Sequence, residues 1–236
     1  MIAMSDDIRL SKTDLTAFAA AIFTAAGVAP EMAAQWADAV VWANLRGVDS
    51  HGVIRIPRYV DLLKKKSINP TPNMQIERRA GAIAVLDADR APGALGMTRA
   101  MDEAIACARE VHVGWCAAKT IGHAGAVGYF ALQAAHAGMA GIVMTASGPL
   151  MAYHGARVAG VSTNPIAIAV PAKTRRPLLL DMSTSTVANG RSWPRAIAAR
   201  QCRPAGASTP RGATPLTRRR SRRCCRSAAR RDRGSR

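Results

Sequence analysis

The stretch "RGVDSHGVIRIPRY", residues 46–59, gathers side chains suited to the chemistry of small organic acids. Ser50, His51 and Arg55 follow one another at short spacing within it. A guanidinium grips a carboxylate through two parallel hydrogen bonds, and an imidazole gives or takes a proton near neutral pH. These residue types together fit a 2-oxo or 2-hydroxy acid. The same stretch is also compatible with a solvated turn in which Ser50 or Asp49 caps the next helix.

A second candidate is "IGHAGAVGYF", residues 121–130, where His123 lies between an expected strand and the start of an expected helix. Such turns expose reactive groups in α/β proteins, and the small residues around this histidine let a ligand approach the backbone. A single histidine in a turn is more often structural, so His123 is a candidate site residue only in combination with residues 46–59. Gly122, Gly125 and Gly128 do not have the G-x-G-x-x-G spacing of a dinucleotide fingerprint.

A nicotinamide cofactor would therefore bind here without the ordinary Rossmann turn. The segments "TASGP", "STNPIAIAVP" and "LLLDMSTS" offer Ser, Thr, Asn and Asp side chains that can hold ribose and phosphate. Thr163 and Asn164 belong to the second of these segments. The five cysteines lack the spacing of zinc ligands, and no metal site is expected.

Helices and strands must position these residues. Ser11, with Asp14 three residues later, predicts the cap of a first helix, whose apolar stripe includes Phe18. Further helices are expected over 30–46, 57–66, 93–113 and 126–138, and strands over 74–80, 81–89, 113–121, 141–147, 164–172 and 177–183. Helices first, then strands alternating with helices, predict an α/β fold: a helical N-terminal region followed by a mixed, partly parallel sheet with helices.

The charge of the chain is concentrated at one end. Of the 33 Lys and Arg residues, 15 lie after Gly190, where Asp232 is the single acid, so this segment carries +14 of the net +18. The first 190 residues have the balance of an ordinary globular protein. No apolar run approaches the roughly 20 residues that cross a bilayer, and a cytoplasmic location without disulfides is expected.

In this order, "ANLRGVDSHGVIRIPRY", "GHAGAVGYF", "STNPIAIAVP" and "LLLDMSTS" resemble the type 2 malate/L-lactate dehydrogenase family, which also contains ureidoglycolate, sulfolactate and diketogulonate members. The resemblance covers residues 15–190. It implies a non-Rossmann, NAD(P)-binding fold of the sulfolactate dehydrogenase-like type, built as a homodimer. The implied reaction is hydride transfer between NAD or NADP and a small 2-hydroxy or 2-oxo acid such as malate or lactate.

The resemblance also implies roles for individual residues. His51 and His123 match histidines that handle the proton in different members. Ser50 and Arg55 match positions that orient the substrate. The cofactor-contacting positions that match are Ser147, Asp181, Met182 and Ser183. Which histidine transfers the proton, and whether NAD or NADP is used, stays open, and Gly122 stands where many relatives carry Asn.

The segment 191–236 does not continue the family pattern, and three regions are expected: 1–74, 75–190 and this tail. One interpretation is a disordered basic arm that binds nucleic acid. The preferred one is out-of-frame translation after Gly190. A one-base shift of "PAGASTPRGATPLTRRRSRRCCRSAA" permits "GWGIDAEGRHTTDPAAVTPLLPLGG", which looks like the family's continuation.

Overall fold

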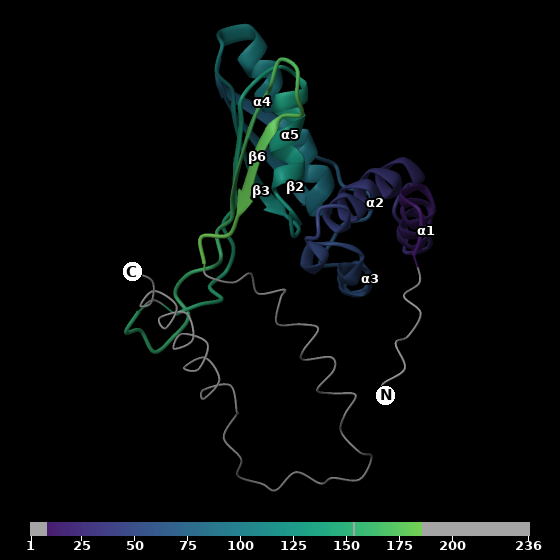
Figure 1. Ribbon diagram of the computed structural model, residues 1–236. Coiled ribbons are helices and arrows are strands. Elements are labelled where there is room, and N and C mark those ends of the chain that lie inside the picture. Colours follow the sequence, from purple (N-terminus) through teal and green to yellow (C-terminus); the bar gives the residue numbers. More distant parts are fainter. Residues whose placement is uncertain (1–8, 153, 186–236) are drawn as a thin grey trace, which may run out of the picture. The chain divides into compact units, whose positions relative to one another are not determined.

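The structure, a computed structural model, describes residues 9–152 and 154–185 (Figure 1), which belong to one compact unit, Met1–Trp193. The expectations for 191–236, namely disorder, nucleic-acid binding and a shifted reading frame, fall outside the described residues.

Three helices form the N-terminal region: α1 (Lys12–Ala25), α2 (Pro30–Asn44) and α3 (Ile56–Lys64). The expected cap of α1 is confirmed, because the backbone N–H of Asp14 donates to Ser11 Oγ at 3.1 Å. Proline in the first turn of α2 has no N–H to lose there. Placing Phe18 on the buried stripe was wrong, since this residue is 62% exposed. The helix buries a narrower face, at Ala19 and Phe23.

The next elements form a mixed three-stranded sheet of β1 (Gln75–Ala80), β2 (Ile83–Ala91) and β3 (Trp115–Ile121), in that order. β1 and β2 are antiparallel, and β2 and β3 are parallel. The helix α4 (Gly93–Val111) makes the crossover between the two parallel strands and packs on both. The part of the prediction that concerns a partly parallel sheet is confirmed here.

The remaining strands form a separate sheet. After α5 (Gly128–His136), the strands β4 (Gly141–Met144), β5 (Ile166–Val170) and β6 (Leu178–Met182) pair in this order, all antiparallel. A single mixed sheet was therefore the wrong expectation for the described residues, which contain two sheets. Alternating apolar residues identify a strand, but they do not identify its partner.

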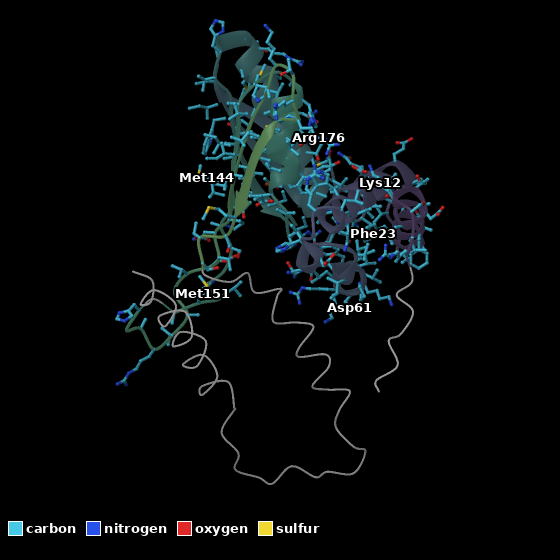
Figure 2. The ribbon with its side chains drawn as sticks, in the orientation of Figure 1. Lys12, Phe23, Asp61, Met144, Met151 and Arg176 are labelled. Atoms are coloured by element: carbon cyan, nitrogen blue, oxygen red, sulfur yellow. The ribbon has the colours of Figure 1, made fainter. Side chains whose placement is uncertain are left out.

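The larger of two buried clusters joins the N-terminal helices to α5 and the second sheet. Phe23 of α1 stacks on Trp36 of α2 with ring centroids 4.1 Å apart, and Tyr59 of α3 lies 5.0 Å from Trp36. Figure 2 shows Phe23 among these helices. Ala131 and Ala167 continue the same cluster in α5 and β5. The cluster contains residues from both sides of the expected boundary between regions 1–74 and 75–190. This boundary stays a prediction.

Candidate active site

The segment between α2 and α3 is a folded double turn, η1 (Asp49–His51) followed by η2 (Val53–Arg55). The Asn44 side chain fastens it: its Nδ2 donates to Asp49 at 2.6 Å, and its Oδ1 accepts from the Val53 N–H at 2.8 Å. A Cβ on Gly52 would lie 2.1 Å from Asn44 Oδ1, so a larger residue there would have to displace the Asn44 side chain that makes these bonds. The alternative that Ser50 or Asp49 caps a helix was wrong, since neither side chain makes such a bond among the described residues.

Arg55 is held inside this turn. It is only 8% exposed, and its Nε donates to the Ser50 carbonyl at 2.6 Å. The Ser50 hydroxyl lies 2.9 Å from His51 Nδ1. One short segment thus fixes three of the expected site residues relative to one another.

His123 lies close to this group although it comes from a distant part of the sequence, the turn between β3 and α5. Its ring stacks near that of His51, with centroids 5.6 Å apart and planes 17° apart. Tyr59 Oη lies 2.9 Å from His123 Nδ1. The structure therefore brings His51, Arg55 and His123 together, while their roles stay predictions. Asn44 and Tyr59, which hold this group in place, were not among the residues expected from the sequence.

The surroundings lower the pKa of both histidines, which favours their neutral form near pH 7. Burial, and then the charge of Arg55, lower the pKa of His51 to about 4. Burial lowers the pKa of His123 to about 3, with further contributions from Arg55, His51 and Arg58. More than a third of the surface of His123 is exposed, and water that reaches the ring weakens the effect of burial on its pKa. The surroundings therefore favour an added negative charge.

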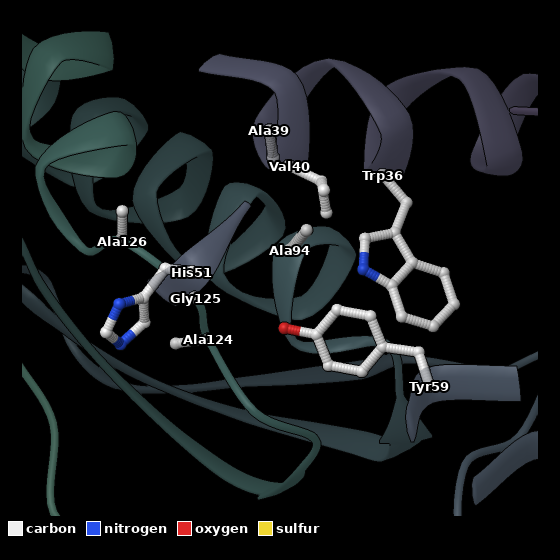
Figure 3. A pocket seen from close by; sticks show the side chains of 9 residues that line it. All are labelled: Trp36, Ala39, Val40, His51, Tyr59, Ala94, Ala124, Gly125 and Ala126. Carbon is white, nitrogen blue, oxygen red and sulfur yellow. The ribbon is translucent and has the colours of Figure 1, made fainter. Parts of the chain in front are cut away.

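Figure 3 shows the pocket beside these rings, with Trp36 and Tyr59 on one side and His51 on the other. Its floor is made of small residues, among them Ala94 and Gly125. The cavity has a volume of about 10 Å³, which is room for roughly one water molecule. A larger ligand would therefore have to extend beyond this pocket, which His51 lines and His123 does not.

Two of the expected cofactor residues, Asp181 and Met182, lie in β6 and point to opposite faces of the second sheet. Asp181 faces α5, where its Oδ2 accepts from the Gly128 N–H at 2.8 Å and so occupies the helix N-terminus. Burial raises the pKa of Asp181, and the bond from Gly128 opposes this rise. Met182 follows Asp181 in the strand and points to the opposite face.

The other expected cofactor residues differ in how their polar atoms are used. The hydroxyls of Ser147 and Ser162 lie 2.6 Å apart, and Ser183 donates to a nearby backbone carbonyl. The Thr163 carbonyl accepts two bonds from Thr184. Asn164 Oδ1, in contrast, is buried without a hydrogen-bond partner among the described residues, and its backbone has φ of 34°.

None of the helices in the described residues is long and apolar enough to cross a membrane. The described residues contain no cluster of three or more His, Cys, Asp or Glu side chains that could hold a metal ion.

Similar proteins were found by sequence. The chain is 42% identical to a malate dehydrogenase of Pyrococcus abyssi over 184 residues, 78% of this chain and 51% of that protein. It is 36% identical to a ureidoglycolate dehydrogenase (NAD(+)) of Escherichia coli K12 over 166 residues, 70% of this chain and 48% of the relative. The chain spans about half the length of the curated relatives it matches.

Solved structures give the same picture. Malate dehydrogenase from Pyrococcus horikoshii OT3 superposes with a TM-score of 0.76 at 41% identity, covering 80% of this chain and 55% of that one. Sulfolactate dehydrogenase from Methanocaldococcus jannaschii gives 0.75 at 34% identity, covering 81% and 56%. The family model for malate/L-lactate dehydrogenase matches residues 10–213, well over half of the chain and beyond Gly190. The chain therefore belongs to the malate/L-lactate dehydrogenase family.

Proposed function

We propose that this chain carries the substrate half of an NAD(P)-dependent oxidoreductase that interconverts a small 2-hydroxy acid and its 2-oxo acid. The observation that carries the proposal is the convergence of His51, Arg55 and His123, from segments about 70 residues apart in the sequence. A homodimer is proposed on the family resemblance alone.

In this proposal each residue has a separate task. Arg55, whose orientation is fixed through its Nε, binds the substrate carboxylate. Ser50 keeps the His51 ring in place. One of the two histidines exchanges a proton with the substrate oxygen. Burial is the main cause of the low histidine pKa values, and the charge of Arg55 adds to it. A carboxylate between Arg55 and the rings offsets this added charge, so substrate binding brings the imidazoles closer to a working protonation state.

The residues present fit a nicotinamide cofactor in part. The buried, unpartnered Asn164 Oδ1 is an acceptor for a ribose hydroxyl or a carboxamide N–H. Thr163 lies beside it, and Ser147 and Ser183 offer further hydroxyls. A bound nicotinamide would supply or accept the hydride, and the side chains would orient the substrate and manage its proton. Asp181 contributes by fixing the N-terminus of α5.

The test is oxidation of NADH and of NADPH in the presence of a panel of 2-oxo acids, including oxaloacetate and pyruvate. We expect turnover with at least one acid, and a drop in kcat of roughly 100-fold or more for His51→Asn or His123→Asn, whichever removes the proton donor. His136→Asn, at the exposed end of α5, is the matched control. If no acid of the panel is reduced, even by a chain with the frame restored, the proposed activity is wrong.

We also propose that residues 191–236 are read out of frame. The family-like string that a one-base shift permits supports this proposal, whereas the family match to residue 213 extends past the expected junction. Sequencing the gene across the Gly190 codon decides the matter: the proposal requires that one inserted or deleted base restores the longer frame.

A further inference from the structure

A buried tyrosine, Tyr59, contacts the ring of His123. Tyr59 is 2% exposed, and its hydroxyl lies 2.9 Å from His123 Nδ1 across 64 residues of sequence. Its ring is packed against Trp36, which stacks on Phe23. Tyr59 is therefore fixed by the core of the N-terminal helices, and it reaches the turn that follows β3.

The direction of this hydrogen bond follows from the need to satisfy the phenol proton. Either the tyrosine donates to Nδ1, or an Nδ1–H donates to the tyrosine oxygen. In the second arrangement the buried phenol proton would need another acceptor, and the described residues provide none. Burial also raises the pKa of Tyr59 to about 12, so the phenol keeps its proton. A buried hydroxyl without an acceptor is costly, so the tyrosine is the donor.

The tautomer of the histidine is then determined. A neutral imidazole that accepts at Nδ1 carries its proton on Nε2. Among the described residues no partner is found for His123 Nε2, which leaves this atom for a ligand at the accessible face of the ring.

We infer that Tyr59 is a positioning residue that donates its hydroxyl proton to His123 Nδ1 and so holds His123 as the Nε2–H tautomer, facing the substrate. This inference rests on the proposed function only for the identity of the ligand. The tautomer itself is a property of the free chain, and it can be measured without turnover.

The experiment is ¹⁵N NMR of the histidine side chains in the full chain, wild type and Tyr59→Phe. The sequence has five histidines, so single His→Asn variants assign the signals. In the wild type we expect the shifts of an Nε2–H tautomer for His123. In Tyr59→Phe we expect a mixture of tautomers and a higher pKa of His123, because a donor to the neutral ring has been removed.

Tyr129→Phe is the matched control. It also removes a phenol, one that donates to Asp38 at 3.0 Å, and it should leave the His123 signals unchanged. An Nδ1–H tautomer in the wild type, or an unchanged tautomer and pKa in folded Tyr59→Phe, would overturn the inference. If Tyr59→Phe does not fold, the tautomer of His123 in the wild type still tests the inference.

Where turnover of a 2-oxo acid is present, Tyr59→Phe should lower kcat by roughly 10-fold, change KM less than twofold and shift the pH profile. A rise in KM alone would mean that Tyr59 binds substrate and would contradict its positioning role. Absence of turnover in every variant would count against the proposed function and leave the NMR test of Tyr59 intact.

Discussion

At the scale of residues, the candidate site consists of the guanidinium of Arg55 and the imidazoles of His51 and His123, which lie close together. Arg55 is nearly buried, and the two histidines beside it are kept neutral by burial and by its charge. An arginine keeps its proton under these conditions, whereas a histidine loses its own. The free site therefore favours the binding of an anion. Protonation of its histidines at low pH should destabilise the folded state.

We predict that the free energy of unfolding falls as the pH is lowered from about 7 to about 5.5. Unfolded histidines bind protons below a pKa of 6.5, whereas folded His51 and His123 do so only near 4 and 3, so the unfolded state takes up more protons in this window. Asp102 and Asp181, whose pKa values are raised by burial, act with the opposite sign at lower pH. Urea unfolding at several pH values measures the slope.

The double variant His51→Asn, His123→Asn should flatten this slope, while His112→Asn, at the exposed end of α4, should not. An equal slope in the double variant and the wild type would show that other groups control the pH dependence.

At the scale of elements, the site depends on close backbone approaches between segments that are distant in sequence. The first residue of α4, Gly93, lies against the turn that carries His123: a Cβ there would come within 2.1 Å of the His123 carbonyl oxygen. Because the obstacle is backbone, it cannot rotate away. The start of α4 therefore fixes the position of His123.

We predict that Gly93→Ala lowers the free energy of unfolding by about 1–3 kcal/mol and displaces His123. Gly148→Ala is the control, since no atom of the described residues lies within 4 Å of the added methyl group. Chemical denaturation and the histidine NMR signals measure the two effects. Wild-type stability in Gly93→Ala would mean that the turn can move, and the rigid placement of His123 would be wrong.

The sequence predicted the elements well and their contacts poorly. Apolar spacing and the Ser11 cap located all five described α-helices, because these signals are local. The two-sheet arrangement was missed because strand partners are set by tertiary packing. Tyr59 was missed for the same reason: its spacing in α3 is that of an ordinary buried residue, and its bond to His123 spans 64 positions.

At the scale of the whole molecule, the second sheet has one face that α5 covers and one face that is exposed among the described residues. Its inner residues pack on α5, as alternate burial along β4 and β5 shows. The outer face presents a continuous apolar surface, because the strand register aligns Ile142 with Ile168 and Leu180, and Met144 with Ile166 and Met182. Apolar patches of this kind promote association between molecules.

We predict that Leu178→Lys, at a position 74% exposed, reduces concentration-dependent aggregation and changes the free energy of unfolding by less than about 0.5 kcal/mol. Thr174→Lys adds the same charge in the turn between β5 and β6, outside the apolar face, and should have a smaller effect. Light scattering against concentration compares the two. Equal effects would show that net charge, rather than the apolar face, controls aggregation.

If His51, Arg55 and His123 form one site for a 2-oxo acid, the unreactive analogue oxamate should bind there, and an NMR titration measures this binding directly. We expect the side-chain signals of His51 and His123 to shift together, with raised pKa values for these two residues, while the signals of His112, His136 and His154 do not shift. Arg55→Met should abolish the response. Signals of His51 and His123 that do not change at saturating oxamate, or that change equally in Arg55→Met, would contradict the claim.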